Sequence, residues 1–107
     1  MQQLANEASL DEAFGAPIFL ILKHSPICPI SGGARIEVEN FVADHPDVPT
    51  GLIDVIEDRP LSQAVAARTG VQHESPQALL LKDGEVAWHE SHWRITAPRL
   101  AEALASD

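Results

Sequence analysis

Residues 17–31 read PIFLILKHSPICPIS, an apolar run that leads into the only cysteine of the chain, Cys28. The uninterrupted apolar stretch 17–22 is typical of a strand that is buried on both faces. After it, apolar residues recur at helical spacing and predict an amphipathic helix; they are Ala34, Val38, Phe41 and Val42. Cys28 is therefore expected at or just before the N-terminus of a helix that follows a central strand.

This position favours a reactive cysteine. Free backbone N–H groups and the helix dipole favour an anion at a helix N-terminus, so the pKa of the Cys28 thiol is expected to fall. Pro29 suits the first helical turn, because its missing N–H breaks no bond there. Ser31 lies on the same helix face as Cys28, and its hydroxyl can donate a hydrogen bond to the thiolate. The alternative is that a lone cysteine is a small buried hydrophobe; the Cys-Pro-x-Ser spacing favours the nucleophile.

Length, composition, net charge and cysteine count limit the class of protein to which the chain can belong. Its 107 residues, 45% of them hydrophobic, predict one domain spanning 1–107 with a real core. The net charge is −9 with scattered basic residues, which argues against a nucleic-acid partner. A single cysteine excludes an internal disulfide and indicates a reducing setting, so a cytoplasmic location is expected. The N-terminal residues do not resemble a signal peptide, and no apolar run approaches the length of a membrane span.

Helices and strands alternate along the chain. A brief strand fits residues 2–5, and Ser9 with Glu12 forms the pattern of a capping box, which predicts a helix to about Phe14. The remaining predicted elements are a strand at 17–23, a helix ending near 45–46, a strand at 50–57, a helix from 58–60 to a C-cap at Gly70, strands at 78–81 and 85–89 joined by the hairpin signal Asp83-Gly84, and a last helix capped by Thr96.

This order, (β)αβαβαββα, limits the architecture. Strands separated by helices need right-handed crossovers and a parallel core, while the hairpin adds an antiparallel edge. The sequence therefore predicts an α/β, thioredoxin-like fold, with a central mixed sheet of four or five strands flanked by helices.

Six short blocks carry a resemblance to a known family: CPIS at 28–31, EDRP at 57–60, RTGV at 68–71, HESPQ at 73–77, KDG at 82–84 and SHW at 91–93. Together they resemble the monothiol bacilliredoxins, small thioredoxin-like proteins tied to the thiol bacillithiol. The resemblance runs from about Phe19 to Leu104. One departure is Ile27, where the family usually has a threonine, so a hydroxyl beside the sulfur is absent.

The resemblance implies a thiol–disulfide oxidoreductase that removes bacillithiol from S-bacillithiolated protein cysteines after oxidative stress. Cys28 would be the nucleophile, and Ser31 would stand where a dithiol relative has its resolving cysteine. Bacillithiol would then act as a thiol co-substrate, with no bound cofactor. The expected partners are S-bacillithiolated client proteins and a low-molecular-weight thiol, and the chain is expected to be a monomer without nucleic-acid or membrane partners.

The same resemblance points to the residues that would hold the substrate. Ser75-Pro76 is expected to form a cis peptide bond that faces Cys28; the alternative is a trans proline that opens an edge strand. Ser91, His92 and Trp93 are expected to touch bacillithiol, since glutaredoxin-like relatives use this neighbourhood for their thiol. The competing interpretation is that Trp93 packs the last helix.

The histidines leave two questions open. His24 lies four residues before Cys28 and either supports the thiolate as a protonated imidazole or ends a strand at the surface. His89 and His92 are three residues apart, but they straddle a strand end without a clear third ligand, so no metal site is expected.

Two other functions stay open from the sequence. One is a non-catalytic thioredoxin-like adaptor, for which Cys28 would have a pKa near the free value of about 8.5. The other is an iron–sulfur carrier like the monothiol glutaredoxins, against which Pro29 argues because their motif is Cys-Gly-Phe-Ser.

Overall fold

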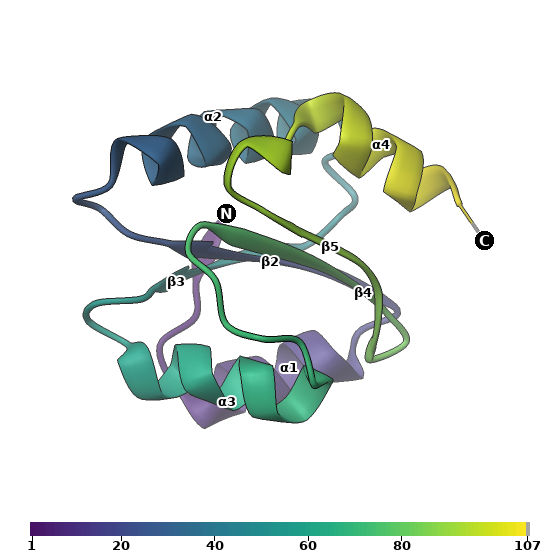
Figure 1. Ribbon diagram of the computed structural model, residues 1–107. Coiled ribbons are helices and arrows are strands. Elements are labelled where there is room, and N and C mark those ends of the chain that lie inside the picture. Colours follow the sequence, from purple (N-terminus) through teal and green to yellow (C-terminus); the bar gives the residue numbers. More distant parts are fainter. Residues whose placement is uncertain (107) are drawn as a thin grey trace.

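The computed structural model describes residues 1–106 and contains one five-stranded sheet in the order β1-β3-β2-β4-β5. Helices α2 and α4 cover one face of the sheet, and α1 and α3 cover the other (Figure 1). The elements are β1 (Gln2–Gln3), α1 (Glu7–Gly15), β2 (Ile18–His24), α2 (Pro29–Asp44), β3 (Thr50–Asp54), α3 (Arg59–Thr69), β4 (Gln77–Lys82), β5 (Glu85–Ser91), the 3₁₀ helix η1 (His92–Arg94) and α4 (Ala97–Ala105). The predicted mixed sheet and thioredoxin-like order are confirmed.

Strand β2 is the centre of the sheet. It pairs in parallel with β3 and antiparallel with β4, and its residues from Phe19 to His24 are all buried. Alternate side chains serve two separate cores: Leu20 and Leu22 pack beneath α2 and α4, whereas Phe19 and Ile21 pack against α1 and α3. The prediction of a strand buried on both faces is therefore confirmed.

The edge hairpin of β4 and β5 turns where the sequence predicts. Asp83 and Gly84 have φ angles of 54° and 81°, the left-handed pair that a tight two-residue hairpin needs. A Cβ on Gly84 would lie 2.6 Å from the carbonyl oxygen of Phe14, so this position also requires the absence of a side chain. Gly70 ends α3 with a φ of 73°, as expected for a helix C-cap.

Two predicted boundaries are wrong by three residues each. Helix α1 begins at Glu7 with Asn6 as its N-cap, and Ser9 takes the third position of the capping box rather than the first. The Ser9 N–H donates to Asn6 Oδ1 at 2.9 Å, so an asparagine three residues earlier does the work expected of Ser9. The strand predicted at 50–57 ends at Asp54, because Asp54 Oδ1 accepts the N–H groups of Ile56 and Glu57 and starts a turn.

Side chains fasten the helices to each other and to the sheet. Arg68 of α3 pairs with Glu7 and Asp11 of α1 at 2.9 and 2.8 Å. Lys82 of β4 donates to carbonyl groups at the C-terminal end of α4, where a cation is favoured by the helix dipole. Within residues 1–106 no helix combines the length and apolarity needed to cross a membrane.

Candidate active site

Cys28 is the N-cap of α2, directly after the loop that leaves β2. Its N–H donates to the Ser25 carbonyl at 3.2 Å, and its carbonyl accepts the Gly32 N–H at 3.1 Å, the first bond of the helix. Pro29 occupies the first helical position as predicted. The side chain of Cys28 is partly exposed, so the interpretation of a buried hydrophobic cysteine is wrong.

The helix start lowers the pKa of the Cys28 thiol below its ordinary value. The largest cause is a hydrogen bond from the backbone N–H of Ser31; partial burial opposes it, and the Ile30 N–H and the Ser31 hydroxyl lower the pKa further. Each donor favours the charged sulfur, so the thiolate is more populated near neutral pH than that of a free cysteine. This is the electrostatic requirement for a nucleophile in thiol exchange.

Ser31 has a second role in holding the loop. Its side chain is fully buried, and its hydroxyl oxygen accepts the Ser25 N–H at 3.2 Å. The residue that stands in the place of a resolving cysteine thus ties together the two ends of the Cys28 loop.

His24 fits neither of its two predicted roles as stated. It ends β2, but its side chain is only 8% exposed, so the surface interpretation is wrong. Burial lowers its pKa, with Arg35 adding to the effect, so the imidazole is neutral at pH 7 and a positive ring is not available to the thiolate. Its Nδ1 atom is buried without a hydrogen-bond partner among the described residues.

The Ser75-Pro76 peptide bond is cis, as expected, and the alternative of a trans proline is wrong. The Pro76 carbonyl accepts the His92 N–H at 3.1 Å, which joins the proline loop to η1. Pro76 is buried, and the Ser75 hydroxyl is buried without a partner among residues 1–106. That Ser75 and Pro76 contact a substrate on Cys28 stays a prediction.

The segment Ser91–Trp93 lies where β5 passes into η1. Trp93 is 75% exposed, so it does not serve mainly to pack the last helix. His92 and Trp93 line a cavity of about 260 Å³ together with Ile30 and Gly33 from the first turns of α2. The structure therefore places two of the three residues expected to touch bacillithiol beside the helix that begins at Cys28.

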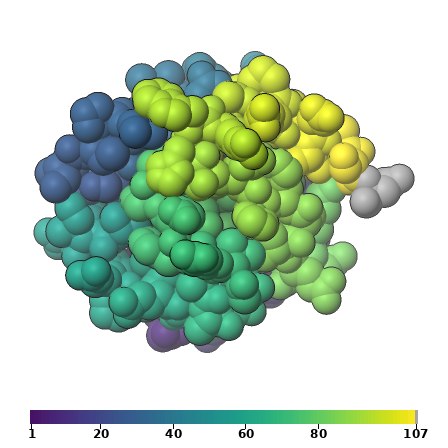
Figure 2. Space-filling model, in the orientation of Figure 1, coloured from purple at the N-terminus to yellow at the C-terminus, as the bar shows by residue number. Residues whose placement is uncertain are grey.

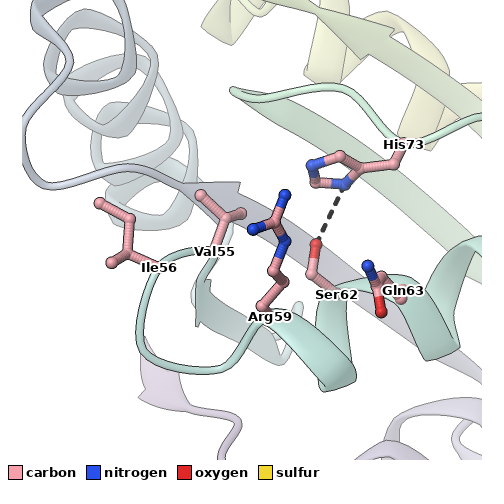
Figure 3. A pocket seen from close by; sticks show the side chains of 6 residues that line it. All are labelled: Val55, Ile56, Arg59, Ser62, Gln63 and His73. Atoms are coloured by element: carbon pink, nitrogen blue, oxygen red, sulfur yellow. Dashed lines mark hydrogen bonds between the residues drawn. The ribbon is translucent and has the colours of Figure 1, made fainter.

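A second cavity of about 370 Å³ lies on the other side of the sheet and was not expected (Figure 3). Arg59 and His73 line it, and His73 is hydrogen-bonded to the buried Lys23. From the sequence, Lys23 is interpreted as the polar end of a strand. Its burial could have been predicted from strand alternation, because Phe19, Ile21 and Lys23 point to the same face of the sheet. Among residues 1–106, no three histidine, cysteine or acidic side chains lie together as a metal site would require.

Two loops and the 3₁₀ helix η1 come together at the edge of the sheet that carries Cys28. β2 and β3 are parallel, so the Cys28 loop and the β3–α3 loop leave the sheet at the same edge, and the Val55 N–H donates to the His24 carbonyl at 3.0 Å. Figure 2 shows the dark-blue surface at the start of α2 adjoining both the teal surface of the β3–α3 region and the yellow-green surface of η1.

Comparisons with known proteins agree with this geometry. The family described as monothiol bacilliredoxin BrxC matches residues 1–100. A solved structure provisionally described as an oxidoreductase with a thioredoxin fold shares 32% identity, covers 96% of this chain and 92% of its own, and superposes with a TM-score of 0.91. Thioredoxin from Fasciola hepatica, at 18% identity with 97% and 96% of the chains covered, has a TM-score of 0.76 and supports the fold alone. The chain therefore belongs to the monothiol bacilliredoxin family and is a thiol oxidoreductase of thioredoxin fold.

Proposed function

We propose that this protein removes bacillithiol from S-bacillithiolated cysteines of client proteins. The observation that carries the proposal is a single, partly exposed cysteine at the N-cap of α2 whose thiol pKa is lowered. The chain has no second cysteine, so Cys28 cannot form an internal disulfide, and a thiol from another molecule must resolve its mixed disulfide. We place it in a reducing cytoplasm, where the protein acts as a monomer on its clients.

The exchange conserves disulfide bonds at each step. The Cys28 thiolate attacks the bacillithiol sulfur of the client's mixed disulfide, a Cys28–bacillithiol bond forms, and the client's S–S bond breaks. The client leaves as a thiolate and takes a proton from water. A second thiol then attacks the Cys28–bacillithiol bond; when this is free bacillithiol, the products are oxidised bacillithiol and the regenerated Cys28 thiolate.

The surface around Cys28 supports docking of a protein client. Ile27, Ile56 and Trp93 are 82%, 52% and 75% exposed; they belong to the Cys28 loop, the β3–α3 loop and η1. Exposed apolar side chains grouped near a reactive atom are typical of a protein-binding surface. Ile27 supplies apolar surface where the family usually has a threonine, and the thiolate relies instead on the N–H groups of α2.

The test is to incubate the protein with oxidised bacillithiol and measure its intact mass. We expect one bacillithiol adduct on Cys28 that is absent in Cys28→Ser and is reversed by free bacillithiol. A client peptide carrying S-bacillithiolated cysteine should then lose its modification in the presence of the wild-type protein. If no adduct forms at any pH while Cys28 still reacts with iodoacetamide, the adaptor function replaces this one.

A further inference from the structure

Within residues 1–106, Lys23 is a buried cation without an acidic partner. Its side chain is fully buried on the α3 face of β2, and its Nζ lies 3.1 Å from Nδ1 of His73. None of the ion pairs within residues 1–106 includes Lys23. A buried ammonium is costly unless a negative charge or several acceptors compensate it, so this arrangement favours an anion nearby.

The hydrogen bonds of His73 fix which of its nitrogens carries the proton. Nδ1 lies 3.1 Å from Lys23 Nζ and 3.0 Å from the Ser62 hydroxyl. A lysine ammonium is a donor only, so Nδ1 accepts and the proton of the neutral ring is on Nε2. Figure 3 shows this second nitrogen on the side of the ring that faces Arg59. His73 therefore offers an N–H donor to the same cavity that the Arg59 guanidinium lines.

The cavity is positive although the chain is acidic. Its lining residues are Val55, Ile56, Arg59, Ser62, Gln63 and His73, none of which is an acid. The neighbouring acids Glu57 and Asp58 line a different cavity beside α1. Burial is the largest cause of the lowered pKa of His73. Among the neighbouring charges, Lys23 and Arg59 also lower this pKa, and Glu74 raises it. Arg59 has no ion-pair partner within residues 1–106, so its guanidinium is available to a ligand.

Part of the cavity wall lies at the same edge of the sheet as Cys28, where the parallel strands β2 and β3 end. The Cys28 N–H bond to the Ser25 carbonyl closes a turn, which holds the Cα atoms of these residues within about 7 Å. Adding the single step from His24 to Ser25 places Cys28 Cα within about 11 Å of His24 Cα. Val55, which lines the cavity, is hydrogen-bonded to His24.

We propose that this cavity, lined by Arg59 and His73 above the buried Lys23, binds a carboxylate of the low-molecular-weight thiol while its sulfur is bonded to Cys28. This inference rests on the proposed function, because bacillithiol carries malate carboxylates. A guanidinium binds a carboxylate through two parallel hydrogen bonds, and the His73 Nε2–H adds a third donor. The cavity beside Trp93 suits an anion less well, since Glu37 lines it.

The test compares two disulfide substrates in the intact protein: oxidised bacillithiol, which carries carboxylates, and 2-hydroxyethyl disulfide, which does not. The readout is the ratio of the rate constants for adduct formation on Cys28. In Arg59→Gln this ratio should fall about tenfold, as loss of a charge-assisted hydrogen bond predicts. Arg59 is exposed, so the variant should fold. Arg99→Gln is the matched control: it removes the same charge from an exposed arginine of α4 and should leave the ratio unchanged.

A direct binding measurement separates the two proposals. Malate titrated into ¹⁵N-labelled protein should shift the His73 signals in the wild type and not in Arg59→Gln. An equal substrate ratio in Arg59→Gln and Arg99→Gln would overturn the inference even if malate binds to the wild type. Arg59 would then bind free malate without recognising the carboxylate of the thiol that reacts with Cys28. Failure of the wild type to react with oxidised bacillithiol would instead overturn the proposed function, whereas absence of malate shifts would overturn the cavity as a carboxylate site.

Discussion

The Ser31 hydroxyl accepts the Ser25 backbone N–H at 3.2 Å, although Ser31 belongs to α2 and Ser25 to the loop before it. The same hydroxyl is one of the groups that lower the pKa of the Cys28 thiol. One buried oxygen therefore closes the loop around the sulfur and helps to hold its charge. In a monothiol protein, the position of the missing second cysteine is thus still needed for the first one.

Ser31→Ala should raise the pKa of the Cys28 thiol only modestly. The largest cause of the lowered pKa is the Ser31 backbone N–H, which alanine keeps, and only the hydroxyl contribution is lost. The variant should also lose about 1 kcal/mol of unfolding free energy, because the Ser25 N–H loses its acceptor. Thiolate absorbance at 240 nm against pH and urea denaturation measure the two effects. Ser91→Ala is the control, and an unchanged Cys28 pKa in Ser31→Ala would contradict the assignment.

Lys23→Met should stabilise the protein at pH 7. Burial lowers the Lys23 pKa to about 8, so below that pH the folded protein bears the full cost of a buried charge. With an unfolded pKa of about 10.4, this cost is up to about 3 kcal/mol. Between the two pKa values the unfolded chain holds the proton and the folded chain does not. Wild-type stability should therefore rise as the pH increases from about 8 to about 10, and Lys23→Met should lack that rise.

Urea denaturation at pH 7 and pH 9.5 measures this difference, with Lys82→Met as the matched control. Lys82 donates to carbonyl groups at the end of α4, so the same substitution there should destabilise the protein at pH 7. A Lys23→Met variant that is less stable than the wild type at pH 7 would show that the ammonium is compensated in the folded state.

Alanine substitutions at the adjacent residues Gly32 and Gly33 can distinguish an effect on helix stability from an effect on substrate binding. A Cβ at Gly32 or Gly33 would meet no atom within 4 Å, so alanine at either position should stabilise α2 by up to about 1 kcal/mol. Only Gly33 lines the cavity with His92 and Trp93. Gly33→Ala should therefore slow adduct formation with oxidised bacillithiol, whereas Gly32→Ala should not. Equal rates in the two variants, measured by intact mass, would remove this cavity from the thiol-binding site.

The sequence predicts the fold well because local signals and global topology agree. Three local signals each favour one conformation of low free energy, and the structure adopts it: the apolar run before Cys28, the Asp83-Gly84 turn and the Gly70 cap. The errors at Ser9 and at the end of β3 arise where a polar side chain accepts backbone N–H groups. Asn6 and Asp54 are these acceptors, and hydrophobic periodicity carries no information about such side-chain-to-backbone hydrogen bonds.

The site was only partly predictable, for a different reason. Cys28 and its helix position follow from a contiguous motif, whereas the Lys23–His73 contact joins residues 50 positions apart. Burial also lowers the pKa values of His24 and Lys23, and the sequence alone does not show how deeply either side chain is buried. Only the assembled sheet reveals that His24 is buried and that Lys23 has no acidic partner among residues 1–106.

The two tryptophans have different expected roles: Trp88 packs against the core, whereas Trp93 is exposed and is expected to bind the thiol. Trp93 is 75% exposed, so Trp93→Ala should change the unfolding free energy by less than about 0.5 kcal/mol. Trp88 packs against the core beneath α4, and Trp88→Ala should cost about 3 kcal/mol. We expect Trp93→Ala to slow the reaction of Cys28 with oxidised bacillithiol several-fold while its iodoacetamide reactivity stays unchanged. If both reagents react at wild-type rates, Trp93 contacts neither the thiol nor the sulfur, and its exposure serves client proteins alone.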